Sequence, residues 1–523
     1  MLDDDHDDGA ASHPTTRRDG PHHDETPALR RRWVSFLISC ALGSAACSSA
    51  KEEKPEAAPA PETADPAPVQ GTRPGGDTSI AIGPSPSLVQ PAANLDDDAK
   101  SRFYAGKALA TQPWVRAPTQ TDARDGLGPV YNARTCLGCH IKGGRGPTAS
   151  REDEPLLASL VRLSLPGRGP HGEPIPEPVY GTQLQPQSTS LGHQLRGHAS
   201  ADAVKDLGPA PEAQAFIRWT TVPFQYPDGK TVELREPTLE LRELGYGALN
   251  PETRKGIRHT PSLAGVGLLE LVDQADIDRH ADPDDRDGDG ISGRVNRVWD
   301  PESKSERPGR FGLKANQPSV RVQVAGAFSG DIGITSPVFP QQPCTERQPR
   351  CLAAPSGADA DGVEISEELL ELVVFFNMSI AVPERRKPTH PKVVRGQALF
   401  EDAGCGSCHT PHYVTGSDPA YPHLSTQDIW PYTDMLLHDM GAGLADGRED
   451  FLATGSEWRT PPLWSVGLAR AMHDDVGFLH DGRARTVEEA IVWHDGEGRR
   501  SRDRFSALSE ADRRSLVAFV RSL

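Results

Sequence analysis

The pentapeptides Cys136-Leu137-Gly138-Cys139-His140 and Cys405-Gly406-Ser407-Cys408-His409 share the pattern Cys-x-x-Cys-His. In this pattern two thiols add across the vinyl groups of one haem, and the adjacent histidine is placed to ligate the iron. A redox-active dithiol needs no such histidine, and a zinc site needs further cysteines or histidines at matching spacing. We therefore expect two covalently bound haem c groups, attached at Cys136, Cys139, Cys405 and Cys408 and ligated by His140 and His409.

A separate segment predicts export from the cytoplasm. The apolar run at residues 33–47 follows Arg30, Arg31 and Arg32 and ends in small residues, which is the layout of a secretory signal. The run is shorter than the ~20 apolar residues of a membrane-spanning helix, so we expect it to be cleaved. Haem c is attached outside the bacterial cytoplasm, and the two signals therefore agree on a periplasmic or outer-surface location.

The end of this signal also suggests a lipid anchor. Gly43-Ser44-Ala45-Ala46-Cys47 resembles a bacterial lipoprotein cleavage box, in which Cys47 would carry the lipid. Simple secretion is the alternative, because Ser44 stands where such boxes usually carry leucine. Residues 1–47 are thus an N-terminal extension and signal. Residues 48–100 are rich in proline, alanine and glutamate, and we expect a disordered tether because they bury too little apolar area to offset ordering.

The charge of the chain limits its partners. Its formal net charge is -18, which argues against nucleic acid, because phosphate binding needs a basic face. A basic redox protein would suit this charge, and the simpler interpretation is that acidity keeps an exported protein soluble.

Two related segments predict two haem domains. Residues 260–268 (TPSLAGVGL) and 460–468 (TPPLWSVGL) are identical at six of nine positions, and each follows one Cys-x-x-Cys-His. We expect a mainly α-helical protein with two cytochrome c-like domains, at residues 101–385 and 386–523. The first would carry large loop-rich insertions with short strands. A chance match of a loop motif is the alternative.

The second half has the helices expected of a small cytochrome c. Residues 390–400 are predicted to form a helix before the haem cysteines, and Ser509-Glu510-Ala511-Asp512 resembles a capping box that opens a C-terminal helix. Gly396 would let these two helices cross closely. Phe103, Gly106 and Leu109 are a partial counterpart in the first half.

A third histidine is a candidate iron ligand. Thr486-Val487-Glu488-Glu489 resembles a capping box that opens a helix running to His494, and Val487, Ala490 and Ile491 share a face with His494. A histidine on an apolar face is elsewhere more often a buried, hydrogen-bonded residue. In a chain that binds haem, we interpret His494 as an axial ligand of the second haem.

Several further motifs resemble the di-haem oxidoreductase family of proposed peroxidases, over roughly residues 101–523. They are Asp125-Gly126-Leu127-Gly128-Pro129, Gly309-Arg310-Phe311-Gly312, Asp331-Ile332-Gly333-Ile334-Thr335-Ser336, Leu437-His438-Asp439-Met440-Gly441 and Phe478-Leu479-His480-Asp481-Gly482-Arg483. The second half is also distantly similar to the electron-accepting domain of bacterial di-haem cytochrome c peroxidases. His494 falls where those enzymes place methionine, which implies bis-histidine ligation and a lower haem potential.

The sequence leaves other iron ligands open. His438, Met440 and His480 compete with His494 at the second haem, although we expect His438 and His480 to line the haem or bind its propionates. For the first haem the sequence offers His259, His280, His193 and His198, and none stands out. If no side chain closes that site, its iron is five-coordinate and open to peroxide.

Two smaller features concern other sites. Cys344 and Cys351 flank a short polar loop and are predicted to form a disulfide in an oxidising compartment.

Asp285, Asp287 and Asp289 alternate before Gly290 like the opening of a calcium-binding loop, but position twelve is Asn296 instead of glutamate. An acidic solvated turn is the alternative to calcium, which the similarity to di-haem peroxidases favours slightly.

Together these features predict a redox enzyme. The second haem would accept electrons from a small carrier, a cytochrome or a cupredoxin, and pass them to the first haem, where peroxide or another small oxidant is reduced. This division of labour is what the resemblance implies. The alternatives are a non-catalytic di-haem electron-transfer cytochrome and a redox or binding partner in an iron-acquisition system.

Overall fold

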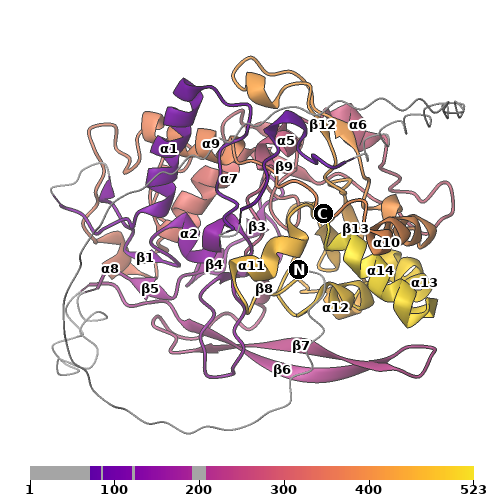
Figure 1. Ribbon diagram of the computed structural model, residues 1–523. Helices are drawn as coiled ribbons and strands as arrows, with labels where there is room; N and C mark the ends of the chain where they lie inside the picture. Colours follow the sequence, from indigo (N-terminus) through magenta and orange to yellow (C-terminus); the bar gives the residue numbers. More distant parts are fainter. Residues whose placement is uncertain (1–70, 84–85, 120–123, 191–207) are drawn as a thin grey trace, which may run out of the picture. The chain divides into compact units, whose positions relative to one another are not determined.

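The computed structural model describes residues 71–83, 86–119, 124–190 and 208–523 (Figure 1). Its longer helices are α1 (Asp97–Thr111), α7 (Val320–Ala327), α9 (Glu367–Met378), α10 (Pro391–Asp402), α13 (Arg499–Ala507) and α14 (Glu510–Val520). Its shorter helices are α2 (Cys136–Cys139), α5 (Val266–Glu270), α6 (Gln274–Asp278), α8 (Pro349–Leu352), α11 (Ala469–Met472) and α12 (Val487–Val492).

The strands form several small antiparallel sheets. One joins β2 (Ser159–Arg168) to β3 (Pro174–Ile175), β4 (Gln183–Leu184) and β8 (Arg254–His259). The others are the pairs β1 (Val130–Tyr131) with β5 (Gln187–Ser188), β6 (Gln214–Gln225) with β7 (Thr231–Arg242), β9 (Arg297–Asp300) with β10 (Ser305–Pro308), β11 (Tyr413–Val414) with β12 (Asp428–Ile429), and β13 (Leu437–Asp439) with β14 (Glu457–Arg459).

The prediction of a mainly α-helical protein is wrong. Helices make up 28% and strands 19% of the chain, so the fold mixes both. The largest departure is the β6–β7 hairpin, whose strands pair without a break from Gln214 opposite Arg242 to Gln225 opposite Thr231. Its turn at Asp228-Gly229 lies between alternating apolar and polar residues, a pattern that is typical of a β-hairpin.

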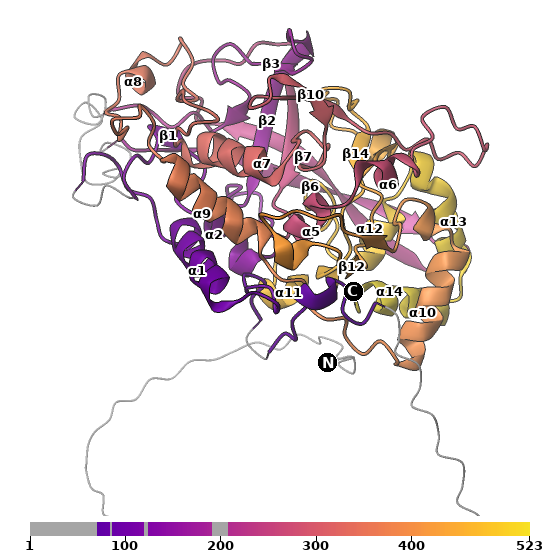
Figure 2. The same cartoon turned by 90° about the horizontal axis from the view of Figure 1, so that it is seen from above.

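Two helix pairs cross closely, one in each half of the chain. Helix α10 packs on α14, and α1 packs on α9 (Figures 1 and 2). A Cβ on Gly396 would lie 1.9 Å from the carbonyl oxygen of Ser515, and a Cβ on Gly106 would lie 1.9 Å from that of Leu372. Only glycine permits these approaches, which confirms the predicted role of Gly396 and its counterpart.

The predicted helix ends are also confirmed. Ser509 accepts a hydrogen bond from the Asp512 N–H and caps α14, whose residues Leu516, Phe519 and Val520 are buried. Phe400 of α10 packs on Phe519 with ring centroids 5.2 Å apart.

The two repeated segments occupy matching places. Gly265 and Ser465 both have left-handed backbone angles, with φ of 69° and 65°. A Cβ on Gly267 would lie 2.0 Å from the carbonyl oxygen of Met378 at the end of α9, and one on Gly467 would lie 1.9 Å from that of Arg521 just after α14. Each repeat therefore packs against the second helix of its own pair, which favours a duplicated unit over a chance match.

The two halves share their largest cluster of buried apolar side chains. One cluster of buried side chains contains Val89, Phe103 and Val374 together with Met435 and Trp464 from the second half. The repeats also touch each other, because Ser262 Oγ lies 3.1 Å from Ser465 Oγ. The β6–β7 hairpin of the first half reaches the second half, where Tyr226 Oη donates to Glu488 over 2.9 Å.

Residues 71–83 and 86–100 do not behave as the predicted tether. Leu88 and Val89 are buried, and Ile80 N–H donates to the Val382 carbonyl over 3.1 Å. A few apolar side chains are enough to hold this segment on the protein, because they pack into a core that other elements already form. The rest of the predicted tether, the signal and Cys47 lie outside the described residues. Among those that are described, no helix is long and apolar enough to cross a membrane.

Candidate functional site

The first Cys-x-x-Cys-His forms one helical turn followed by its histidine. Thr135 caps α2 by accepting a hydrogen bond from Gly138 N–H over 2.8 Å. His140 Nδ1 donates to the carbonyl oxygen of Pro261 over 2.8 Å. Pro261 belongs to the first repeated segment, so this repeat orients the histidine. Because Nδ1 is the donor, Nε2 keeps its lone pair, which is the form that binds iron.

The second Cys-x-x-Cys-His has the same arrangement. Gly404, with φ of 78°, leads into the turn η5 (Cys405–Ser407). His409 Nδ1 donates to the carbonyl oxygen of Tyr432 over 2.9 Å. The carbonyl again fixes the tautomer and leaves Nε2 for a metal.

His494 repeats the pattern a third time. Thr486 caps α12 by accepting from Glu489 N–H, as the sequence predicts, and the chain reaches His494 two residues after the helix ends. His494 Nδ1 lies 2.8 Å from the Ala490 carbonyl and leaves Nε2 without a partner among the described residues. A positive charge on His494 would lower the pKa of His409, so the two imidazoles lie near each other.

Desolvation favours the neutral form of all three imidazoles. Burial lowers the pKa of His140 and His409 to about 4 and also lowers that of His494. A neutral imidazole with a fixed Nδ1–H is what an iron ligand requires. The three residues therefore fit haem iron in tautomer and in charge.

The four motif cysteines are not activated thiols. Burial raises the pKa of Cys136, Cys139 and Cys405 to about 12, and it also raises that of Cys408. A redox-active Cys-x-x-Cys needs a lowered thiol pKa, because the thiolate is the nucleophile. This environment disfavours the dithiol interpretation and suits sulfurs bonded to a haem.

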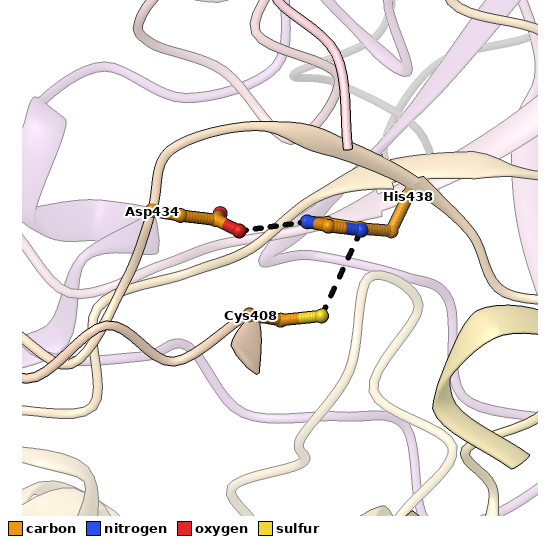
Figure 3. Close-up of side chains that lie close together, drawn as sticks. All are labelled: Cys408, Asp434 and His438. Carbon is orange, nitrogen blue, oxygen red and sulfur yellow. Dashed lines mark hydrogen bonds and ion pairs between the residues drawn. The ribbon is translucent and has the colours of Figure 1, made fainter. Parts of the chain in front are cut away.

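His438 and Asp434 lie close to Cys408 of the second haem motif. The His438 ring lies between Asp434 and Cys408 (Figure 3), with Nε2 2.8 Å from an Asp434 oxygen and Nδ1 3.7 Å from the Cys408 sulfur. Nδ1 is also 2.6 Å from Glu497. Burial opposes charge on His438, but the hydrogen bonds to Asp434, Cys408 and Glu497 outweigh it and raise its pKa. Both ring nitrogens donate, so His438 is not placed to ligate iron.

Comparison with known proteins agrees with this geometry. The family model described as "di-haem oxidoreductase, putative peroxidase" matches residues 69–523, which is most of the chain. The chain belongs to this family. No curated protein and no solved structure matches it. The resemblance inferred from the sequence is confirmed, and the match begins earlier than expected, near the start of the described residues.

His480 and Met440, the other candidate ligands of the second haem in this oxidoreductase, have different surroundings. The His480 ring stacks on Trp458, with centroids 3.6 Å apart and planes 12° apart. Its Nε2 lies 3.4 Å from Asp481. Met440 is a neighbour of His494, because atoms of both side chains lie within 3.3 Å of the position that a Cβ on Gly498 would occupy. His480 is thus engaged elsewhere, whereas Met440 is a neighbour of the proposed ligand.

The candidates for the first haem are only partly placed. His193 and His198 lie outside the described residues, and His280 is exposed. His259 is fully buried, with Nδ1 3.0 Å from Ser159 Oγ and Nε2 without a hydrogen-bond partner among the described residues. Burial lowers the pKa of His259 to about 3, so it is neutral.

Sequence reasoning missed a half-buried carboxyl beside the first site. Asp331 lies in the π-helical turn η4 (Phe328–Ile332), and its charge would raise the pKa of both Cys136 and Cys139. Burial raises the pKa of Asp331 itself. Gln183 donates to Asp331 over 2.8 Å, while the buried Gln183 Oε1 has no partner among the described residues. The unpaired Gln183 Oε1, on the side chain that binds Asp331, is a buried polar atom of the kind that a bound group can satisfy.

A signal for Asp331 was present in the sequence. Asp331 belongs to a segment, residues 331–336, that resembles the di-haem oxidoreductase family. Nothing in that segment indicates that Asp331 lies near the first haem motif, about 190 residues earlier in the chain. Gln183 carries no motif at all. Their proximity depends on strand β4 and on η4, which tertiary packing brings together.

Two predicted features lie apart from the haem motifs. Cys344 and Cys351 form a disulfide with Cα atoms 5.7 Å apart. The exposed carboxylates of Asp285, Asp287 and Asp289 offer oxygens within 4.8 Å of one another. Asn296, at position twelve, is instead buried and donates to the Lys314 carbonyl, so the turn lacks the closing ligand of an EF-hand.

Proposed function

We propose that this oxidoreductase is an exported c-type enzyme that reduces peroxide, or another small oxidant, at a haem held by Cys136, Cys139 and His140. Electrons would arrive at a second haem, held by Cys405 and Cys408 and ligated by His409 and His494. The observation that carries the proposal is the shared arrangement of three half-buried imidazoles whose Nδ1 atoms donate to backbone carbonyls. Haem iron supplies the redox chemistry when bound.

The residues assign different tasks to the two sites. At the second site, His409 and His494 would both bind one iron, which leaves no position for a substrate. At the first site, the charge of Asp331 acts on Cys136 and Cys139, and Gln183 donates to Asp331. Reduction of peroxide consumes two electrons and two protons per molecule and yields two waters. Asp331, whose pKa desolvation raises, is suited to give a proton to the departing oxygen when its carboxyl is protonated.

A contiguous path joins the two sites. His438, beside Cys408, pairs across β13–β14 with Trp458, so the two side chains share a face of the sheet. Trp458 in turn stacks on His480.

The path continues through backbone to the first site. The His480 carbonyl accepts from His259 N–H over 2.7 Å. Two residues later, the Pro261 carbonyl accepts from His140. Packed aromatic rings and short hydrogen bonds are a suitable medium for electron transfer between the proposed haems.

The proposal is tested on full-length protein matured in a host that attaches haem c. We expect one high-spin haem that binds cyanide, one low-spin haem that does not, and peroxide-dependent reoxidation of the reduced protein. Two low-spin haems inert to cyanide and peroxide would contradict the enzyme and favour an electron-transfer cytochrome. Growth under iron limitation with the gene deleted examines the iron-acquisition alternative.

Location and calcium are further parts of the proposal. Export to the periplasm or outer surface is supported by the predicted signal and by the Cys344–Cys351 disulfide. Radiolabelled palmitate incorporated by the native chain, and lost in Cys47→Ala, would support the lipid anchor.

Calcium at Asp285, Asp287 and Asp289 is supported by their convergent oxygens. Calorimetric titration should show binding that Asp287→Asn weakens, and no heat would contradict the site.

A further inference from the structure

Helix α13 presents an arginine-rich surface although the chain as a whole is acidic. Four of its nine residues are arginines, whereas the formal net charge of the chain is -18. Arg499 forms an ion pair with Asp495 over 2.8 Å, and Arg502 forms one with Asp503 over 2.9 Å. Arg500 and Arg504 are exposed and have no ion-pair partner in the described part of the chain. Four residues apart on one helix, they project from the same face.

This face borders the attachment loop of the second haem. A Cβ on Gly404 would lie 2.9 Å from the Arg504 guanidinium, and the charge of Arg504 acts on the Cys405 sulfur. Arg499, Arg500 and Arg504 line one surface pocket of about 530 Å³. The carboxylates of Asp289, Asp503 and Glu497 line it too, and Glu497 binds His438.

The attachment loop itself is open to solvent. A Cβ on Gly406 would meet no atom within 4 Å, and Ser407 is exposed. By contrast, a Cβ on Gly138 in the first motif would lie 3.3 Å from Thr135 Oγ1. A protein carrier can thus reach the chain beside Cys405 and contact Arg500 and Arg504 in the same approach.

We propose that Arg500 and Arg504 form the docking surface for an acidic electron-carrier protein, which delivers electrons to the second haem beside Cys405. The inference rests on the proposed function, because it names the partner of that haem. The local charge, not the net charge of -18, decides which partner docks. A cluster of unpaired arginines attracts a negatively charged face and raises the rate of encounter, with strong dependence on ionic strength. The basic partner suggested by the net charge would be repelled at this surface.

The test measures reduction of the second haem by stopped flow under anaerobic conditions. The donor protein is reduced plant-type ferredoxin, an acidic carrier whose potential of about -400 mV suits a bis-histidine haem. Arg500→Glu with Arg504→Glu should lower the second-order rate constant about tenfold at low ionic strength, and the rate constant should no longer fall as salt is added.

A matched double variant controls for the change in net charge. Arg297 and Arg307 are exposed on the β9–β10 hairpin and form no ion pair with another described residue. Arg297→Glu with Arg307→Glu adds the same negative charge and should change the rate constant by less than about twofold. Equal slowing in both double variants, or none in Arg500→Glu with Arg504→Glu, would overturn the docking surface.

A second donor separates this inference from the proposed function. Photoreduced riboflavin is small and uncharged, so it should reduce the second haem at the same rate in all three proteins. A slower reaction with riboflavin in Arg500→Glu with Arg504→Glu would mean a damaged haem site and overturn the docking interpretation. If ferredoxin distinguishes the variants but the reduced protein does not consume peroxide, the docking surface stands and the peroxidase proposal fails.

Discussion

The imidazole Nδ1 atoms of His140, His409 and His494 each face a backbone carbonyl, but the sequence reveals these residues to different degrees. His140 and His409 follow from a five-residue pattern whose chemistry needs a histidine at that place. His494 follows from a capping box and one apolar face, which indicate a helix and not a ligand. Asp331 and its partner Gln183 were not predictable, because no local pattern places Asp331 near Cys136.

His494→Ala tests the ligand assignment. We expect the low-spin haem to become high-spin and to bind cyanide, because removing the imidazole opens the sixth position. Covalent haem content should not change, since attachment depends on Cys405 and Cys408. Met440→Leu is the matched control and should keep the low-spin spectrum. If Met440→Leu alters the spectrum and His494→Ala does not, Met440 is the ligand.

Asp331→Asn tests the proton donor. The raised pKa of Asp331 means that its carboxyl stays protonated at higher pH than an ordinary aspartate. The peroxide reaction of the native protein should therefore slow as pH rises through that pKa. Asp331→Asn should lower the rate about 10²-fold and remove this dependence, because an amide cannot supply the proton. An unchanged pH profile with normal cyanide binding would exclude Asp331 as the donor.

At the scale of elements, periodicity and capping predicted α10, α14 and the close crossing at Gly396. The sequence did not lead us to the β6–β7 hairpin, although Asp228-Gly229 between alternating strands was a usable signal. Apart from β2 and β8, the other strands have two to four residues each and no periodicity to detect, since tertiary pairing alone defines them.

Gly396→Ala tests the crossing of α10 and α14. Replacing glycine by alanine usually stabilises an exposed helix by about 1 kcal/mol. Here the added Cβ would meet the Ser515 carbonyl at 1.9 Å, so the helices must separate. We expect a loss of about 1–3 kcal/mol in the free energy of unfolding, measured by denaturant titration. Gly406→Ala, where a Cβ meets nothing within 4 Å, should leave stability unchanged. Equal stability of the two variants would argue against the close crossing.

At the scale of the whole molecule, the sequence predicted two related halves and the structure adds that they share a core. Residues such as Val89 and Trp464 meet only when segments far apart in the chain pack together. Composition does not predict the packing of residues 71–83 and 86–100. A proline-rich segment with a few apolar residues has the same composition whether it is a disordered tether or is packed on the core. The family match from residue 69 agrees with the packed segment.

The measurement that bears most directly on the central claim is the intact mass of the mature chain, together with its haem absorbance after denaturation. We predict the mass of the polypeptide plus two haems, and one haem fewer in either Cys136→Ala with Cys139→Ala or Cys405→Ala with Cys408→Ala. A polypeptide mass without any haem, or a haem count unaffected by either double substitution, would contradict covalent attachment at these two motifs.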